Sequence, residues 1–308
     1  MTRRDGVGGF RSPEARARFL SVYDTLVEQT WPVPCEELDV ATSYGSTHVR
    51  RSGPAAGAPL VLLHPGIVSS VIWSRLVEPL AEHHPVYALD TMGTAGRSVQ
   101  VAPLGGWSGV GRWFEETVAG LGLEGVHVVG WSEGGWVALL AGMSAPARIG
   151  SLTLLEPAAG LRPFRPAADL RGIVAGLPLL TGLGSPHTAL VKLSRWVNPE
   201  TELTELEVQL MLTAIKAHRY RLPFPKVLSD KQLASISMPT LVLLAEKTVI
   251  NHPREVADRA NALLPDVEVE IVPGAGHDLP VARPERVAAR ILQFVDNPSR
   301  TMSGSNEC

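Results

Sequence analysis

The pentapeptide Gly130-Trp131-Ser132-Glu133-Gly134 contains the residue best suited to chemistry, Ser132. An apolar run at 126–129 precedes it and a helix-favouring run at 136–140 follows it, which predicts a strand, a sharp turn and a helix. Glycines in such a turn leave room for the neighbouring strand and helix, which allows the chain to bend sharply. The sharp bend lifts the serine hydroxyl out of the sheet. The start of the helix also offers free N–H groups where negative charge can develop. We therefore predict that Ser132 is a nucleophile; the alternative is a buried turn serine that caps the helix.

A serine hydroxyl is a weak nucleophile near neutral pH and needs a general base, which a third group must orient. The candidate base is His277, because it follows the last expected strand in the glycine-rich loop 273–278. Other histidines have more ordinary expected roles. His127 is expected in the core and His64 is expected to brace the loop that it begins. The histidines expected to face solvent are His83, His84 and His218.

A second loop could stabilise an oxyanion. It begins at His64-Pro65-Gly66-Ile67 and leaves a buried strand that is expected to lie beside the serine turn. A backbone N–H of Gly66 or Ile67, together with that of Glu133, could form the oxyanion hole, where each donor can lower a barrier by ~2.7–4 kcal/mol. Trp131, next to the nucleophile, is expected to line the substrate pocket, and a mainly apolar acyl or aromatic substrate is the default expectation.

The elements that must position these groups alternate between strand and helix. Apolar runs predict strands at 59–64, 85–90, 126–130, 149–156, 240–244 and 267–272, and a hairpin at 37–42 and 47–51 completes eight. Amphipathic segments between the apolar runs predict helices, including one that Ser12-Pro13 opens. This alternation predicts an α/β fold with a mostly parallel eight-stranded sheet covered on both faces. The candidate groups all fall at carboxyl ends of strands, where such sheets bind ligands.

The alternation divides the 308-residue chain into parts. Residues 1–35 form an N-terminal extension with a leading helix, and residues 36–156 and 236–297 form the α/β core. Residues 157–235 break the alternation with proline, arginine and helical stripes, which predicts a helical lid inserted over the carboxyl edge of the sheet. Residues 298–308 are predicted to be a flexible tail.

Composition excludes several classes of function. The formal net charge is −3 and no long basic run is present, which argues against nucleic-acid or membrane partners. No apolar stretch approaches the length of a membrane span, so a cytoplasmic protein is expected. The two cysteines, Cys35 and Cys308, make no disulfide framework, and no Cys/His spacing resembles a zinc site. We expect a small-molecule substrate with no metal and no cofactor; the sequence does not indicate an oligomeric state.

These motifs occur in a characteristic order: His64-Pro65-Gly66, the loop 90–98, Gly130-x-Ser132-x-Gly134 and Gly276-His277. In this order the chain resembles the α/β-hydrolase superfamily over roughly residues 36–297. It looks most similar to bacterial carboxylesterases of the naproxen-esterase kind, which share the leading helix and a helical cap. The resemblance implies that Ser132 is the nucleophile and His277 the general base, while the fold hosts many chemistries.

The sequence departs from the family where its triad acid is usually found, a few residues past the strand at 240–244. Thr248 occupies that position, and a threonine cannot stabilise an imidazolium by charge. Three explanations compete. Glu156, at the end of the neighbouring expected strand, could reach His277 because adjacent strands lie only ~4.8 Å apart. Alternatively, Glu246 or Asp278 could serve after a local shift, or no acid is needed.

The function that follows is a serine hydrolase that cleaves a carboxylic ester or thioester through an acyl-serine intermediate, with Ser132, His277 and Glu156 as catalytic residues. The missing acid at Thr248 motivates an alternative, a lyase or cyclase of small-molecule metabolism, and a ligand-binding pseudoenzyme is a third. Glu156 could instead have a purely structural role, as a carboxylate at the end of a strand that pairs with a lid arginine such as Arg162 or Arg165. We expect these two arginines and Arg171 to lie on a solvated surface rather than to bind an acidic substrate.

Overall fold

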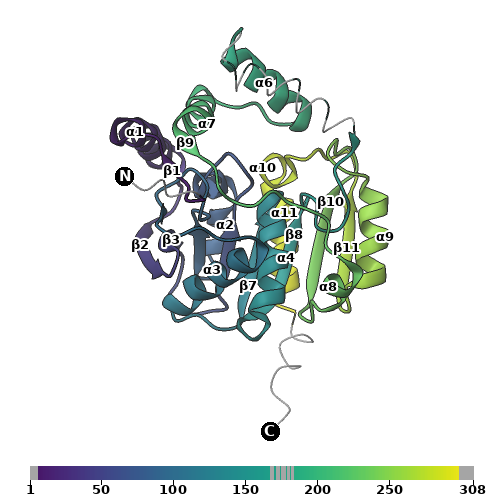
Figure 1. Ribbon diagram of the computed structural model, residues 1–308. Coiled ribbons are helices and arrows are strands. Elements are labelled where there is room, and N and C mark those ends of the chain that lie inside the picture. Colours follow the sequence, from purple (N-terminus) through teal and green to yellow (C-terminus); the bar gives the residue numbers. More distant parts are fainter. Residues whose placement is uncertain are drawn as a thin grey trace.

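The computed structural model describes residues 6–297 apart from 167–169, 171–173, 175–177, 179–180 and 182–183. Arg171 and the predicted tail 298–308 therefore lie outside the described residues. The described part is built on a nine-stranded sheet with helices on both faces, which confirms the expected α/β fold (Figure 1). No helix in these described stretches is both long and apolar enough to cross a membrane.

The sheet runs in the order β11-β10-β8-β7-β4-β5-β3-β2, and the short β6 pairs with β3 outside this path. The pairs from β11 to β5 are parallel, while β3 pairs antiparallel with its neighbours. In this sheet the prediction of eight strands missed β6, and it also missed the two strands of a separate small sheet, β1 (Gly9–Phe10) and β9 (His218–Arg219), because a two-residue strand has no periodicity to read. The bounds are β2 (Cys35–Thr42), β3 (Gly45–Ser52), β4 (Leu60–Leu63), β5 (Val86–Leu89), β6 (Val99–Gln100), β7 (Val126–Trp131), β8 (Ile149–Leu155), β10 (Thr240–Ala245) and β11 (Val267–Val272).

Alternate side chains of the central strands enter two hydrophobic clusters, one on each face of the sheet. In β4, Val61 and Leu63 pack on one face, and Leu60 and Leu62 pack on the other. A strand buried on both faces must be wholly apolar, which explains its continuous hydrophobic run. The first face is covered by α3 (Trp107–Gly120), α4 (Glu133–Ser144), α8 (Asp230–Ala234) and α9 (Pro253–Leu263); the second by η1 (Ser70–Arg75), α2 (Val77–Ala81), α10 (Leu279–Ala282) and α11 (Pro284–Val295).

Helices from distant parts of the chain lie above the carboxyl ends of the parallel strands, at the upper side of Figure 1. The leading helix α1 (Pro13–Thr30) begins as predicted, because the Ser12 side chain accepts a hydrogen bond from the Ala15 N–H at 3.1 Å. It packs through Phe19 and Tyr23 in a cluster that includes Leu210 of α7. The other elements here are α6 (Pro186–Val197), α7 (Glu205–Ala217), β1 (Gly9–Phe10) and β9 (His218–Arg219); the short η2 (Pro146–Arg148) precedes β8.

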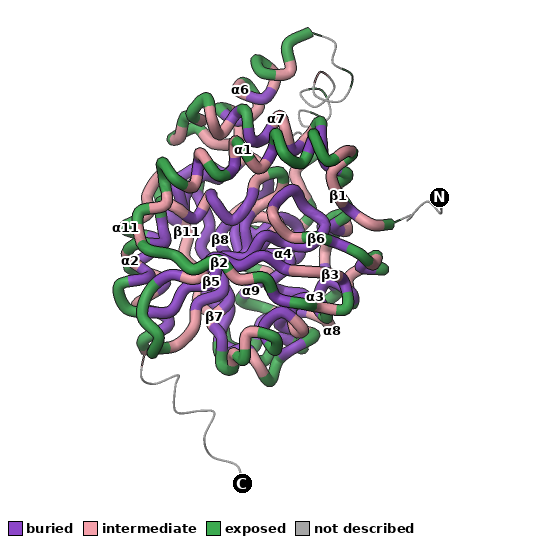
Figure 2. The backbone as a smooth tube through the Cα atoms, turned by 90° about the vertical axis from the view of Figure 1, so that its left-hand side faces the viewer, coloured by how far each residue is buried: buried purple, intermediate pink, exposed green. Residues whose placement is uncertain are grey.

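Burial follows this arrangement. Figure 2 shows the strands as a buried centre, with exposed residues along the outer sides of α1 and α6. The two-stranded sheet of β1 and β9 joins the N-terminal segment to the chain that leaves α7. The division into a core and a helical lid inserted at 157–235 remains a prediction.

Candidate active site

Ser132 occupies a strained turn between β7 and α4. Its backbone has φ 54° and ψ −116°, a conformation that side-chain-bearing residues rarely adopt. The Ser132 N–H donates to the Leu155 carbonyl of the next strand at 2.9 Å, which fixes the turn to β8. A Cβ at Gly134 would come within 2.0 Å of the Leu63 carbonyl oxygen, so glycine is required there. The predicted strand, turn and helix are confirmed.

Two carboxyl-end loops bring partners to this serine. Ser132 Oγ lies 3.1 Å from His277 Nε2, and His277 Nδ1 lies 3.1 Å from Glu156 Oε2. A carboxylate only accepts hydrogen bonds, so His277 carries its proton on Nδ1 and donates it to Glu156. The other ring nitrogen is then free to accept the proton of the Ser132 hydroxyl. The three side chains form a continuous hydrogen-bonded chain from the serine hydroxyl to the carboxylate.

Glu156 is fully buried at the point where β8 ends. Its backbone has φ 48°, again in the left-handed region, and its N–H donates to the Leu243 carbonyl of β10 at 2.9 Å. The second carboxylate oxygen, Oε1, accepts the Ala245 N–H at 2.6 Å. Both oxygens are therefore engaged, one by β10 and one by His277, which holds the carboxylate in a single orientation.

The other candidate acids lie elsewhere. Glu246 accepts the Gly274 N–H at 2.8 Å, and Asp278 accepts the Glu200 N–H at 3.0 Å. Thr248 is buried, but its hydroxyl has no hydrogen-bond partner among the described residues. Neither Arg162 nor Arg165 pairs with Glu156: Arg162 forms an ion pair with Glu255, and Arg165 contacts the Thr248 carbonyl.

The expected oxyanion residues lie beside each other. Ile67 has φ 55°, which turns the loop after β4, and a Cβ at Gly66 would come within 2.7 Å of Glu133 Oε2. The Glu133 carboxyl therefore packs against Gly66, and it accepts a hydrogen bond from the Tyr220 hydroxyl. Burial of the carboxyl raises the pKa of Glu133 to about 7, although the Tyr220 hydroxyl lowers it. Near neutral pH this site can therefore hold a protonated carboxyl.

Trp131 is buried, and its expected role in lining the substrate pocket stays a prediction. Its side chain is 4% exposed and packs edge-on against Trp73, with ring centroids 6.3 Å apart. The indole N–H donates to the backbone carbonyl of His277 at 3.1 Å. Because side chains alternate along β7, Trp131 points into the core on the α11 side of the sheet and supports the histidine loop from beneath.

The remaining histidines have structural roles. His64 braces its loop as predicted, since its Nδ1–H donates to the Pro65 carbonyl at 2.7 Å and Nε2 accepts the Thr91 N–H at 3.1 Å. Burial lowers the pKa of His64, which favours this neutral form. His127 contacts the Ser151 hydroxyl at 2.6 Å, and burial, followed by the nearby His84, lowers its pKa to about 4.

Two of the three histidines expected at the surface are buried. His84 lies beside the Ala58 carbonyl at 3.0 Å and Asp296, and His218 packs against the ring of Phe10. Segments distant in sequence cover these side chains, so the local sequence pattern could not indicate that they are buried. His83 is exposed, as expected.

Sequence reasoning also missed two residues that contact the site. Tyr220 and Glu200 lie 87 and 76 positions from their partners Glu133 and Gly276. Both come from the segment between β8 and β10, whose sequence carries no motif for these contacts.

A narrow apolar cleft lies close to the loop that carries Gly66. It is bounded by α1, η1 and α7, and its residues are Leu26, Thr30, Val68, Ser69, Val71, Ile72, Ser74, Leu203, Glu207, Leu210 and Met211. Val68 directly follows the expected oxyanion residue Ile67, while Ser132 and His277 do not line the cleft.

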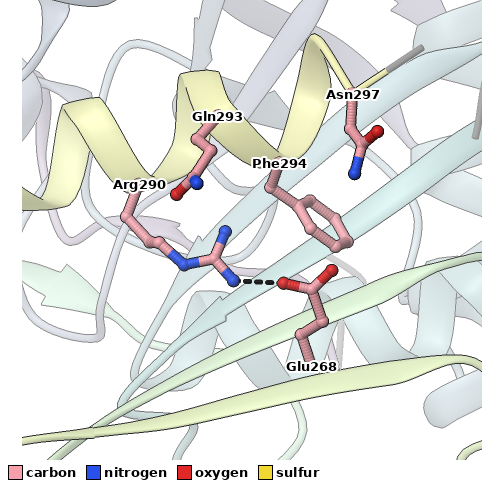
Figure 3. Close-up of a pocket in the computed structure, with 5 residues that line it drawn as sticks. All are labelled: Glu268, Arg290, Gln293, Phe294 and Asn297. Atoms are coloured by element: carbon pink, nitrogen blue, oxygen red, sulfur yellow. Dashed lines mark hydrogen bonds and ion pairs between the residues drawn. The ribbon is translucent and has the colours of Figure 1, made fainter. Parts of the chain in front are cut away.

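A second hollow, of about 250 Å³, belongs to the opposite edge of the sheet (Figure 3). It lies between Glu268, near the start of β11, and the last turn of α11, where Arg290 pairs with Glu268. Parallel strands place their starts and ends at opposite edges, so this hollow is remote from Ser132. Within the described ranges, no group of three or more His, Cys, Asp or Glu side chains could hold a metal ion.

The fold and this site define a class of proteins. Residues 60–290 match the model of the alpha/beta hydrolase family, and the chain belongs to that family. It is 30% identical over 294 residues to the carboxylesterase YbfK of Bacillus subtilis, covering 93% of this chain and 96% of the relative. It is also 30% identical to the carboxylesterase nap of the same organism over 291 residues, covering 92% of this chain and 94% of that relative.

Solved structures give the same result. The crystal structures of carboxylesterase CesB (YbfK) and of naproxen esterase, both from Bacillus subtilis, each superpose with a TM-score of 0.83 at 28% identity. Each comparison covers 92% of this chain and 99% of the other. The chain is thus an enzyme of the alpha/beta hydrolase family that is similar to these carboxylesterases.

Proposed function

We propose that the protein hydrolyses a carboxylic ester or thioester of a small, mainly apolar molecule through an acyl-serine intermediate. The observation that carries the proposal is the relay from Ser132 Oγ through His277 to Glu156, with 3.1 Å at each step. The similarity to carboxylesterases over nearly the whole chain supports the same reaction class.

In the proposed mechanism, Ser132 Oγ attacks the acyl carbon while its proton moves to His277 Nε2. The imidazolium that forms is stabilised by the Glu156 carboxylate, which also keeps the ring in the correct tautomer. Backbone N–H groups of Glu133 and of Gly66 or Ile67 stabilise the oxyanion. His277 then gives its proton to the leaving alcohol or thiol, and a water molecule activated by the same histidine releases the acid.

Glu156 weakens the case for the alternatives. A lyase, cyclase or ligand-binding pseudoenzyme was motivated by the missing acid at Thr248. The carboxylate that contacts His277 comes instead from the end of β8, one strand away from β10. A buried carboxylate with both oxygens engaged, next to a histidine and a strained serine, is the arrangement that a nucleophilic serine requires.

The apolar cleft bounded by α1, η1 and α7 supports an apolar substrate, because Val68 continues the loop proposed to hold the oxyanion. Charged lid arginines give no support for an acidic substrate, since Arg162 is paired with Glu255.

The test is covalent labelling with an organophosphonate ester, read by mass spectrometry, together with turnover of p-nitrophenyl esters in oxygen-18 water. We expect one label, on Ser132, and one oxygen-18 atom in the acid product. Ser132→Ala is the blank. An unlabelled Ser132 in folded protein, or a product without oxygen from water, contradicts the proposal.

A further inference from the structure

Glu200, in the segment between α6 and α7, contacts the loop of His277 on both sides of the histidine. Its side-chain Oε1 accepts the Gly276 N–H at 2.9 Å, and its own backbone N–H donates to Asp278 Oδ2 at 3.0 Å. Gly276 and Asp278 are the residues immediately before and after His277. One residue of the helical segment therefore binds the loop at both flanks of the histidine.

An arginine completes this connection. Glu200 Oε2 accepts from Arg283 Nη2 at 2.9 Å and from Nε at 3.2 Å, while Arg283 Nη1 donates to the Pro273 carbonyl at 3.0 Å. Burial raises the pKa of Glu200, but the hydrogen bonds from Arg283 and Gly276 outweigh this and hold it below its ordinary value. Glu200 is therefore a carboxylate, able to accept all three donors, across the neutral range.

Packing adds to these hydrogen bonds. A Cβ at Gly276 would lie 2.6 Å from Pro199 Cδ, so the chain before Glu200 is seated directly on the loop. The loop 273–278 contains two glycines, Gly274 and Gly276, and Gly274 has φ 72°. Glycine backbones are permissive, so contacts from outside the loop must determine where His277 is held.

The relay tolerates little displacement. His277 has to keep Nε2 close to Ser132 and Nδ1 close to Glu156 at the same time, and a 1 Å misplacement can cost on the order of 100-fold in rate. We propose that Glu200 is a positioning residue for His277, through which the segment between α6 and α7 fixes the geometry of the general base. This inference rests on the proposed function for the role of His277.

A purely structural role would predict something different. Both partners of the Glu200–Arg283 pair are about 30% exposed, with side-chain values of 31% and 29%. An ion pair this accessible to water is screened and contributes little to global stability. The positioning role therefore predicts a loss of rate without a comparable loss of the folded state.

The test compares Glu200→Ala and Glu200→Gln with Glu202→Ala as the matched control. Glu202 lies two residues away and pairs only on the surface, with the exposed Arg195. Three quantities are measured: the melting temperature, kcat and KM for a p-nitrophenyl ester, and the low-field proton NMR signal of His277 Nδ1–H. That signal is assigned by its loss in His277→Ala.

We expect Glu200→Ala to lower kcat by about 10- to 100-fold with KM changed less than about threefold, and to broaden or remove the Nδ1–H signal. Glu200→Gln keeps an oxygen acceptor for the Gly276 N–H, so it should retain most of the rate. Glu202→Ala should behave as the wild type.

A Glu200→Ala protein with wild-type kcat and an unchanged Nδ1–H signal overturns the positioning role, whatever its melting temperature. If Glu200→Ala does not fold, the variant Arg283→Met replaces it in the test, because this substitution loosens Glu200 without removing it. A drop in the kcat of Arg283→Met supports the positioning role, and a wild-type kcat overturns it. If the wild type hydrolyses no ester, the proposed function fails, while the Nδ1–H signal still reports whether Glu200 holds His277 against Glu156.

Discussion

The carboxylate of Glu156 joins two neighbouring strands to His277: Oε1 accepts the Ala245 N–H of β10 at 2.6 Å, and Oε2 lies 3.1 Å from His277 Nδ1. The residue that contacts the histidine therefore directly follows β8, and the last residue of β10 provides a backbone donor that holds it. The β8 and β10 strands are parallel neighbours, so their carboxyl ends meet at the same edge.

Glu156→Gln should lower kcat/KM by about 10²–10⁴, because the neutral amide cannot stabilise the imidazolium and can present the wrong hydrogen-bonding partner to Nδ1. Steady-state turnover of a p-nitrophenyl ester measures this. Glu246→Gln is the matched control: it is an exposed carboxylate that binds the same loop through the Gly274 N–H, and its rate should stay within a few-fold of the wild type. Equal rates for Glu156→Gln and the wild type would rule out Glu156 as the acid.

Thr248→Val should stabilise the protein or leave its stability unchanged, and it should retain full activity. The Thr248 hydroxyl is buried without a partner, which costs about 1–3 kcal/mol that an isosteric methyl does not incur. Urea unfolding measures the difference. Thr240→Val provides the contrast, because the buried Thr240 hydroxyl donates to the Met238 carbonyl at 3.1 Å and its loss should cost about 1 kcal/mol. A fall in activity in Thr248→Val would mean that its hydroxyl acts on His277 after all.

Stability should depend on pH through Glu133. Its pKa is raised by burial to about 7 in the folded protein, above its ordinary value of 4.5, so the folded state favours the protonated carboxyl. The contribution of Glu133 to the free energy of unfolding should be highest below about pH 4.5. It should fall as the pH rises toward and through 7, by at most about 1.4 kcal/mol per pH unit.

Urea unfolding at several pH values tests this, with Glu133→Gln expected to flatten the dependence between pH 4.5 and 7. Tyr220→Phe removes the hydroxyl that lowers the pKa of Glu133, so in that variant the loss should extend to higher pH. Identical pH profiles for the wild type and Glu133→Gln would refute the assignment.

Tyr23→Phe should destabilise the protein by about 1–3 kcal/mol. The Tyr23 hydroxyl of α1 donates to Asp90 Oδ2 at 3.0 Å, and Asp90 also accepts the N–H groups of Ser70 and Arg97. This fully buried carboxylate would lose one of its donors. Thermal or urea unfolding gives the value, with Tyr44→Phe as a control at another buried tyrosine outside this network. An unchanged unfolding free energy would mean that the Tyr23–Asp90 hydrogen bond does not help to hold α1 on the body of the protein.

The sequence by itself determined the fold and the two residues at the centre of the site. Strands buried on both faces must be continuously apolar, so β4, β7 and β10 could be read directly. The Gly-x-Ser-x-Gly turn around Ser132 has a local cause, since a Cβ at Gly130 would come within 2.3 Å of the Gly134 carbonyl oxygen. His277 was identified by its glycine-rich loop after the last strand. Each of these signals is contained in a few consecutive residues.

Only the tertiary structure decided which carboxylate contacts His277. From the sequence, Glu156, Glu246 and Asp278 were all candidates, because each follows a strand or flanks the histidine. The choice depends on strand order and on the left-handed backbone at Glu156, which turns its side chain toward the β10 edge. The same holds for Trp131, which the pleat of β7 directs into the core, and for Glu200 and Tyr220. These contacts join segments more than 70 positions apart, and no local pattern encodes a distance in space.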